Sequence, residues 1–248
     1  MILLGGVAMP IVVLSGVLAL TVNTLLALSA PAANDETVVK VIGHQFWWEV
    51  RYPGHNVLTA NEIHIPAGTP VRVRLASQDV IHSFWVPELH GKLDMIPGQT
   101  NTLWLQADRP GVFKGVCAEF CGVQHAKMTF LVIAQPQAEF AAWIAQQQRP
   151  AMLPIEPIAQ RGLEVFLRAG CVECHTVRGT DATGNLGPEL THVGSRRTLG
   201  AGIMANNPGN LGGWIAGPQH IKPGSLMPPT PLAGDDLQAL VTYLTGLQ

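Results

Sequence analysis

The sequence predicts a multidomain protein with one membrane-spanning helix, then an all-β domain of Greek-key type, then an all-α domain. Three observations lead to this prediction. No charged residue precedes Asp35, and residues 11–28 are almost wholly apolar. Between residues 37 and 133, short segments alternate apolar and polar side chains with period two and are separated by turn signals. After Pro157 the pattern becomes helical and is punctuated by glycine.

Length and composition set broad limits on function. At 248 residues the chain is long enough for one large or two small domains. Its formal net charge is -2 and no Lys/Arg run occurs, so there is no electrostatic basis for a nucleic-acid partner. Four cysteines in a chain of this length do not form a disulfide scaffold.

The apolar start predicts a transmembrane helix within residues 1–34. The run at 11–28 approaches the roughly 20 residues that cross a bilayer core. The alternative is a cleaved secretory signal, because Ala30-Pro31-Ala32 provides a small-residue cleavage site. The lack of Lys or Arg before the run, together with the length of the run, favours a retained span.

Residues 35–136 are predicted to form the all-β domain. Residues 71–75 alternate with period two, residues 103–105 do the same, and residues 129–133 are a short β-rich run. Proline and glycine at 66–68, 97–98 and 110–111 supply turns between them. Several short strands at this spacing indicate a Greek-key sandwich or barrel.

Residues 137–157 are predicted to form a short helix and a proline-rich linker, and residues 158–248 the all-α domain. The first helix, 137–148, carries Phe140, Trp143 and Ile144 on one face. A second helix spans 159–169 with Gly170 as its C-cap. A long irregular stretch from 177 to about 208 precedes a final helix at 235–247, whose apolar residues recur at helical spacing.

Residues 117–128 indicate a copper site. Cys121, His125 and Met128 bring thiolate, imidazole and thioether together, and these ligands suit copper. His82 follows a strand and is the best candidate for a second imidazole. Cys117 is one thiolate too many for a single copper, but two cysteines four residues apart can bridge two metal ions. Met128 and a backbone carbonyl of the same loop would then occupy the weak positions.

Two other interpretations of this cluster are a Cys₂His₂ zinc site and a disulfide between Cys117 and Cys121. Neither explains Met128, because a thioether is a poor zinc ligand.

The remaining cysteines form the haem c attachment signature Cys-x-x-Cys-His, in which Cys171 and Cys174 bind the vinyl groups and His175 is the proximal ligand. A thioredoxin-like redox pair is the alternative, but it requires a βαβ context that this region lacks. The sixth ligand of an electron-transfer haem is commonly Met. Met227 lies in a rigid proline loop before the last helix and is preferred over Met204.

Six histidines lie outside these two clusters. His192 and His220 offer imidazoles to the iron, but isolated histidines are usually structural. The others, which have no partner at metal-ligand spacing, are expected to be structural or exposed: His44, His55, His64 and His90.

The copper region resembles subunit II of haem–copper cytochrome c oxidases over residues 39–133. The resemblance rests on Ser-Gln-Asp-Val-Ile-His-Ser-Phe at 77–84, Asp-Met-Ile-Pro-Gly at 94–98 and the Cys-x-Glu-x-Cys-x₃-His-x₂-Met loop. It implies a cupredoxin fold that holds the dinuclear CuA centre. The implied ligands are His82, Cys117, Cys121, His125, Met128 and the backbone carbonyl of Glu119.

The same resemblance implies further roles. The side chain at Glu119 would help to hold magnesium at the contact with the catalytic subunit, with Asp94 near that contact. The family's aromatic patch, where electrons enter, matches Phe46, Trp47 and Trp48; many members have Trp where this chain has Phe46. These aromatic residues are equally well explained as core packing. The family usually begins with two membrane helices, and the single span here resembles the second.

The C-terminal region resembles class I cytochromes c. Its Leu-Gly-Pro segment at 186–188 is similar to the one whose proline carbonyl accepts the proximal imidazole N–H. In that family the last helix crosses the first, and Phe166 and Tyr243 are plausible contacts there.

Together the resemblances imply the electron-entry subunit of a caa-type respiratory terminal oxidase. Electrons from an external donor, such as a cytochrome c or a quinol–cytochrome c reductase complex, would pass through haem c and CuA to haem a of subunit I. Dioxygen reduction to water and proton pumping would take place in subunit I. Subunit III and membrane lipid are further implied partners, and both redox domains would lie outside the bacterial inner membrane.

Two alternatives differ from the oxidase interpretation. One is a CuA-containing nitric oxide reductase component, which the haem type of the catalytic subunit would distinguish. The other is a copper assembly or storage protein. An attached haem argues against the latter, because a copper chaperone has no use for a second redox centre.

Overall fold

The computed structural model describes residues 2–28 and 37–248. They fall into two units, an apolar helix before residue 37 and a folded body from Thr37 to Gln248. The predicted fold class is confirmed: an apolar helix, a cupredoxin-like β-sandwich and a helical domain follow one another along the chain.

The N-terminal unit is one helix. A π-helical segment, Leu4–Ala8, leads into α1 at Met9–Leu28. Leu4–Leu26 is a 23-residue candidate span with a mean hydropathy of 2.1, and none of that window is buried. This length exceeds the roughly 20 residues needed to cross a bilayer core. The unit therefore fits a single-pass membrane protein, while retention of the span stays a prediction.

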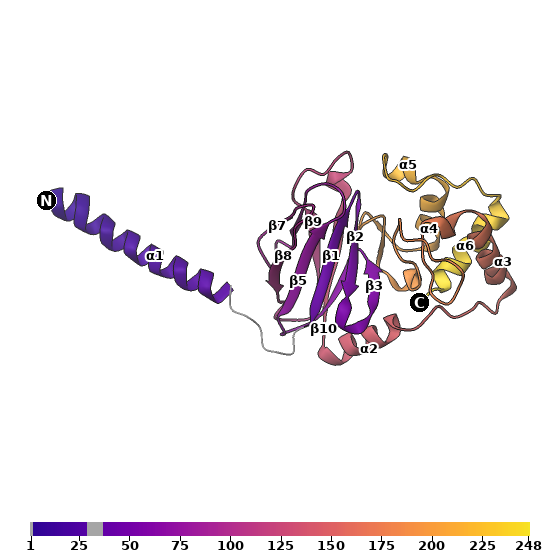
Figure 1. Cartoon of the computed structure of the whole chain (residues 1–248), viewed down its shortest axis with the longest axis horizontal. Coiled ribbons are helices and arrows are strands. Elements are labelled where there is room, and N and C mark those ends of the chain that lie inside the picture. The colour runs from indigo at the N-terminus through magenta and orange to yellow at the C-terminus, as the bar shows by residue number, and fades with distance from the viewer. Residues whose placement is uncertain (1, 29–36) are drawn as a thin grey trace. The chain divides into compact units, whose positions relative to one another are not determined.

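The β domain consists of two five-stranded sheets (Figure 1). The strands of the first sheet, in spatial order, are β3 (Val57–Ala60), β2 (Trp47–Tyr52), β1 (Val38–His44), β5 (Val71–Ser77) and β8 (Asn101–Leu105). Those of the second are β4 (Glu62–Pro66), β10 (Thr129–Gln135), β9 (Gly111–Cys117), β6 (His82–Trp85) and β7 (Leu93–Met95). Most pairs are antiparallel, but β1–β5 and β4–β10 are parallel, so the chain crosses over between them.

Alternation along the strands builds the core between the sheets. In β5, Val71, Val73 and Leu75 are buried, while Arg72 and Arg74 point the other way. Helix α2, Gln137–Gln147, extends this core because Phe140 and Ile144 are buried against it.

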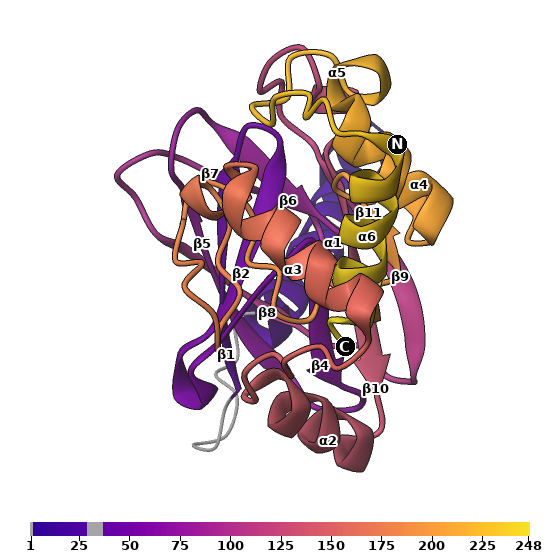
Figure 2. The ribbon, with the colours of Figure 1, turned by 90° about the vertical axis from the view of Figure 1, so that its right-hand side faces the viewer.

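The helical domain has its own core and lies beside the sandwich (Figure 1). Its helices are α3 (Pro157–Arg168), α4 (Pro208–Ala216), α5 (Pro218–Ile221) and α6 (Gly234–Gly246), with a short hairpin of β11 (Thr198–Leu199) and β12 (Met204–Ala205). Figure 2 shows α3 beside α6. Gly162 permits this crossing, because a Cβ there would lie 2.1 Å from the carbonyl oxygen of Ala239. The predicted contact of Phe166 with Tyr243 is present, with ring centroids 5.9 Å apart.

Helix α4 is absent from the sequence prediction. Its three glycines, at 209, 212 and 213, give it low helical propensity. A usable signal was Asn207 followed by Pro208: the Asn207 side chain caps the helix by accepting from the Asn210 amide, and proline suits the first helical position.

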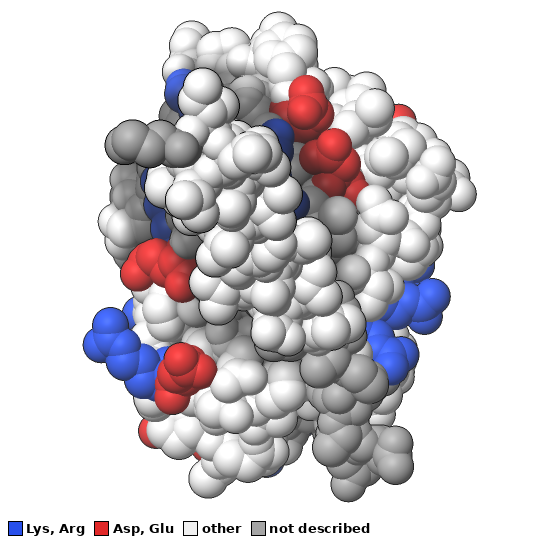
Figure 3. Space-filling model, turned by 90° about the vertical axis from the view of Figure 1, so that its left-hand side faces the viewer, with Lys and Arg blue, Asp and Glu red and all other residues white. Residues whose placement is uncertain are grey.

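Figure 3 shows the charged side chains on one face of the protein. On the face shown in Figure 3, acidic and basic side chains both occur and neither sign forms a continuous surface. This distribution agrees with the net charge of -2.

His64 predicts a pH dependence of stability. Its ring stacks on Trp143 with centroids 4.0 Å apart, and its Nδ1 lies 2.7 Å from Gln135 Oε1. Burial lowers the pKa of His64 from 6.5 to about 4. The unfolded chain therefore binds this proton more readily, so stability contributed by the neutral ring is complete above pH 6.5 and is lost as the pH falls to about 4. The loss should not exceed about 3 kcal/mol.

Chemical denaturation at a series of pH values measures this loss, with His64→Phe as the matched control, since phenylalanine can stack on Trp143 but does not titrate. The wild type should lose stability relative to the variant below pH 6.5. Parallel pH profiles for the two proteins would contradict the assignment.

Candidate metal and haem sites

Two adjacent strands position the cysteine loop of the β domain. Cys117 ends β9, and Met128 immediately precedes β10. The Cys117 amide donates to the Met128 carbonyl over 2.9 Å, which closes the base of the loop. His82 begins β6, which pairs with β9 through Phe84 opposite Cys117. The sheet thus brings a third ligand residue to the loop.

The ligand atoms converge on one small volume. The Sγ atoms of Cys117 and Cys121 are 3.8 Å apart, which is far beyond the roughly 2.05 Å of a disulfide. The Nδ1 atom of His82 lies 3.9 Å from Cys117 Sγ, and that of His125 lies 3.8 Å from Cys121 Sγ. The donor atoms of His82, Cys117 and Cys121 all lie within 4.8 Å of one another.

Two weaker donors complete the group. Met128 Sδ is 3.8 Å from Cys121 Sγ, and the Glu119 carbonyl oxygen is 3.2 Å from Cys117 Sγ. Each sulfur therefore has one imidazole nitrogen and one weak donor within 4 Å. Two shared thiolates with a nitrogen and a weak ligand for each metal fit a dinuclear copper centre better than a zinc site, because thioether is a poor zinc ligand. The identity of the metal and the full ligand set stay predictions.

Residues outside the loop orient its ligands. His82 Nε2 pairs with Asp79 Oδ1 over 2.8 Å, which leaves Nδ1 for the metal. The Gln45 amide donates to Asp79 Oδ2 over 2.6 Å, and the Gln45 side chain donates to the Cys121 carbonyl, also over 2.6 Å. Gly43 leaves room for His82, because a Cβ would lie 2.7 Å from the ring.

Electrostatics favours a thiolate in this cluster. The hydrogen bond with Cys121 lowers the pKa of Cys117, although burial opposes the shift. A thiolate is the form that binds metal. Burial opposes ionisation of Asp79 as well, but hydrogen bonds from His82, Gln45 and Val80 lower the pKa of the Asp79 carboxyl.

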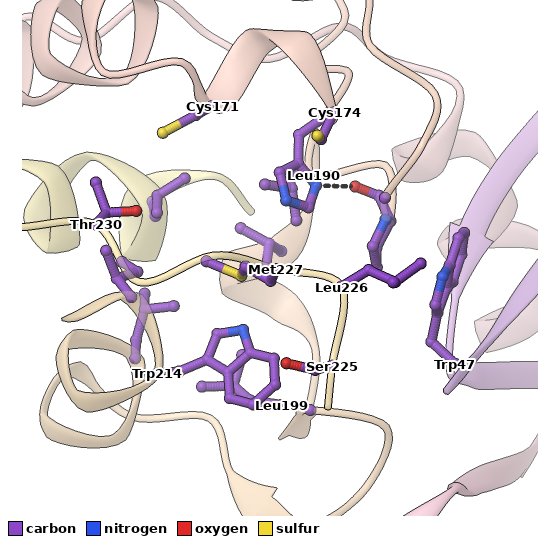
Figure 4. A pocket seen from close by; sticks show the side chains of 18 of the residues that line it. Trp47, Cys171, Cys174, Leu190, Leu199, Trp214, Ser225, Leu226, Met227 and Thr230 are labelled. Carbon is purple, nitrogen blue, oxygen red and sulfur yellow. Dashed lines mark hydrogen bonds between the residues drawn. The ribbon is translucent and has the colours of Figure 1, made fainter. Parts of the chain in front are cut away.

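The predicted haem residues surround one cavity of about 550 Å³ in the helical domain. Figure 4 shows Cys171, Cys174 and Met227 around it, with Trp47 of the β domain at its edge. Its size falls in the usual range for cofactor sites, and apolar side chains provide most of the lining. Met227 lines this cavity, whereas Met204 lies in β12 and is not among the described lining residues.

Backbone contacts hold the haem-binding residues. His175 Nδ1 lies 2.6 Å from the Pro188 carbonyl, which leaves Nε2 for iron. Gly187 allows this approach, because a Cβ would lie 2.7 Å from the His175 ring. Burial lowers the pKa of His175 and favours the neutral imidazole that a metal requires. The residues present therefore fit a haem c, although its attachment stays a prediction.

Gln219 supports the Met227 loop and was missed from the sequence. Its side chain donates to the carbonyls of Ser225 and Met227 over 2.7 and 2.9 Å. The other imidazole candidates are explained without iron: His192 is buried and its Nε2 lies 3.0 Å from the Arg149 carbonyl, while His220 is exposed on α5.

The three aromatic residues predicted as candidates for electron entry lie in different surroundings. Phe46 and Trp47 line the haem cavity, and Trp47 stacks on His44 with centroids 4.4 Å apart. Trp48 is fully buried in the sandwich core, 6.0 Å from the His82 ring and 4.9 Å from Phe130.

Glu119, with its predicted magnesium role, and Asp94, predicted to lie near the same subunit contact, are on different elements. The Glu119 side chain is partly buried on the cysteine loop, and Asp94 is partly buried in β7. The magnesium role of Glu119 stays a prediction.

A β-sandwich with a buried group of cysteine, histidine and methionine side chains is joined here to a helical domain whose Cys-x-x-Cys-His motif lines a cavity, and this combination defines the class of electron-transfer proteins. Residues 55–135 match the family of the cytochrome c oxidase subunit II periplasmic domain, and residues 159–248 match the cytochrome c family. The chain is 35% identical to cytochrome c oxidase subunit 2 of Bacillus sp. strain PS3, over 96% of this chain and 72% of that protein. The chain belongs to the cytochrome c oxidase subunit 2 family.

One further relative and one solved structure are also similar to this chain. Cytochrome c oxidase subunit 2 of Alkalihalophilus pseudofirmus is 44% identical over 88% of this chain, and the matched part spans 64% of that protein. The periplasmic domain of subunit II of cytochrome oxidase from Bradyrhizobium japonicum is a similar solved structure, with 29% identity, a TM-score of 0.46, and coverage of 48% of this chain and 97% of that chain.

Removing the Asp79 carboxylate should weaken metal binding. In Asp79→Ala, His82 loses the partner that directs its Nδ1 to the sulfurs, so we expect copper affinity to fall about 10- to 100-fold. Competition titration with a copper chelator measures it, and haem content serves as the internal control. An unchanged affinity would show that Asp79 does not orient the ligand.

Proposed function

We propose that this chain is the electron-entry subunit of a respiratory terminal oxidase. Electrons from an external donor would pass from haem c to a dinuclear copper centre, and then to haem a of subunit I, where dioxygen is reduced to water and protons are pumped. Both groups, when bound, supply reversible one-electron chemistry. His175 and Met227 would ligate the iron, and Cys171 and Cys174 would hold the porphyrin. The copper ligands would be His82, Cys117, Cys121, His125, Met128 and the Glu119 carbonyl.

The observation that carries this proposal is the position of residues 45–47. Phe46 and Trp47 line the cavity that also contains His175 and Met227. Their neighbour Gln45 donates a hydrogen bond to the Cys121 carbonyl. One short segment therefore contacts both sites, and Phe46 and Trp47 are the better candidates for carrying electrons between them. Trp48 packs the core beneath His82 instead.

Exposed apolar side chains support the proposed partners. Leu226 and Leu186 both line the predicted haem cavity and are exposed, Leu226 to 82%. They would form an apolar rim that an external donor could contact. Such a donor would be a cytochrome c or a quinol–cytochrome c reductase complex. Phe120 is exposed on the cysteine loop, 5.9 Å from the His125 ring. It would contact subunit I, near which Glu119 would bind magnesium.

The remaining features of the assembly follow from the family. With α1 in the membrane lipid, both redox domains would lie on the periplasmic side of the bacterial inner membrane. Subunit III would complete the complex.

Metal content and electron order test the proposal. The purified chain should contain two coppers per haem and show a mixed-valence copper signal, because the Sγ atoms of Cys117 and Cys121 lie 3.8 Å apart and two thiolates at this separation could bridge two coppers. After photochemical reduction of the haem, the copper band should bleach in a second phase whose rate is independent of protein concentration. Optical and EPR spectroscopy measure both.

Cys117→Ser is the matched control for this experiment. It removes one bridging sulfur and leaves the haem residues untouched, so haem reduction should persist while the second phase disappears. One copper per chain, or a second phase that scales with protein concentration, would overturn the proposed path.

A further inference from the structure

Lys222 is a buried lysine at the contact between the two redox domains. It follows α5 and is only 2% exposed. Its Nζ donates to three backbone carbonyls, those of Phe46, Lys127 and Gly200, each over 2.8 Å. The first two belong to the β domain and the third to the helical domain.

These three contacts require the charged form of the side chain. An ammonium has three N–H donors, whereas a neutral amine has two, so only the ammonium satisfies all three carbonyls. Burial lowers the pKa of Lys222 to about 7, which shows how poorly solvated the nitrogen is. Among the described residues no carboxylate forms an ion pair with Lys222. Its charge is offset by backbone dipoles of both domains.

Further hydrogen bonds between the two domains lie near Lys222. The Gln124 side chain donates to the Pro223 carbonyl over 2.7 Å, and Lys127 Nζ donates to the Ile221 carbonyl over 2.9 Å. The Thr129 amide donates to the Ala201 carbonyl over 3.1 Å. We use the term Lys222 seam for the residues that make these bonds: Phe46, Gln124, Lys127 and Thr129 of the β domain, and Gly200, Ala201, Ile221, Lys222 and Pro223 of the helical domain.

The seam joins the segments that carry the predicted ligands. The Lys127 carbonyl immediately precedes Met128, and Lys222 lies five residues before Met227 in the same loop region. Phe46 lines the haem cavity. By contrast, Met152, Leu153 and Ile155 of the covalent linker are exposed. Lys222 is therefore a buried point of contact between the two domains, alongside the bonds that the Arg197 and Thr198 amides donate to the Glu62 carboxylate.

We propose that Lys222 is a positioning residue that holds the helical domain against the cysteine loop and, in its ammonium form, places a positive charge beside the predicted copper site. The consequence for electron transfer rests on the proposed function, whereas the docking itself does not. A nearby cation favours an added electron, so Lys222 should raise the reduction potential of the copper site.

Lys222→Met tests this proposal in the full-length protein. Methionine keeps much of the apolar stem but leaves three buried carbonyls without a donor. Amide hydrogen exchange reports docking directly: exchange at Thr129, whose amide bonds to Ala201, should accelerate, while exchange at Cys117, whose amide bonds to Met128 within the β domain, should not change.

Two further readouts report on the redox centres. The potential of the copper site should fall in Lys222→Met, and haem-to-copper electron transfer should slow by at least about tenfold because the two sites are no longer held in register. Lys114→Met is the matched control, since Lys114 is an exposed lysine of β9 and does not belong to the Lys222 seam. It should leave the potential and the rate close to wild type.

The outcomes separate the two proposals. Unchanged Thr129 exchange and unchanged copper potential in Lys222→Met would overturn the role of Lys222, even if electrons pass between the centres. Faster Thr129 exchange with no haem-to-copper phase in the wild type would support the docking role and overturn the proposed function. If Lys222→Met fails to bind haem, Lys222→Gln replaces it: its amide retains two donors without the charge, so the potential should still fall.

Discussion

The hydrogen bond from the Cys117 amide to the Met128 carbonyl is the constraint on which the cysteine loop depends. It continues the β9–β10 ladder by one further pair, so the ends of the loop are fixed by a sheet. Cys121 and His125 lie within the closed loop, and His82 reaches it from β6, which is hydrogen-bonded to β9. Backbone pairing thus sets the distances between ligands before any metal binds, which reduces the ordering that metal binding must accomplish.

Backbone hydrogen bonds also position the residues around the predicted haem cavity, although these residues lie in turns and loops and not in a sheet. The His175 amide donates to the Cys171 carbonyl, and the Gly187 amide donates to the Cys174 carbonyl. These bonds tie the attachment turn to the segment whose Pro188 carbonyl fixes the His175 ring. On the opposite side of the cavity, the loop that carries Met227 is irregular. The Gln219 side chain holds this loop by donating hydrogen bonds to the carbonyls of Ser225 and Met227. The Pro188 carbonyl orients the side chain of His175, and Gln219 holds the backbone that carries Met227, so each predicted iron ligand is positioned by a residue that is not itself a predicted ligand.

Features that depend on short-range spacing could be predicted from the residues themselves, whereas the contact of Phe166 with Tyr243 was predicted only through the family resemblance. The two cysteine motifs are local, as are the period-two strands and the helices at 157–168 and 234–246. Helix α4 was missed because its three glycines lower its intrinsic helical propensity, while burial of Leu211 and Ile215 stabilises it in the folded domain. Gln45 and Lys222 carry no motif, since their partners lie far along the chain or in the other domain. Gln219 carries none either, although its partners Ser225 and Met227 are only six and eight residues away.

A covalent linker and a buried seam have different physical effects. A tether raises the effective concentration of one domain near the other, but it does not select an orientation. Lys222 does, because its three donors must meet carbonyls from three segments at once. Partial separation would leave a buried ammonium with unsatisfied donors, which is costlier than either the fully docked or the fully solvated state. Intermediate arrangements are therefore disfavoured. Since Lys222 has no carboxylate partner among the residues that the structure describes, its contact is either formed in register or absent.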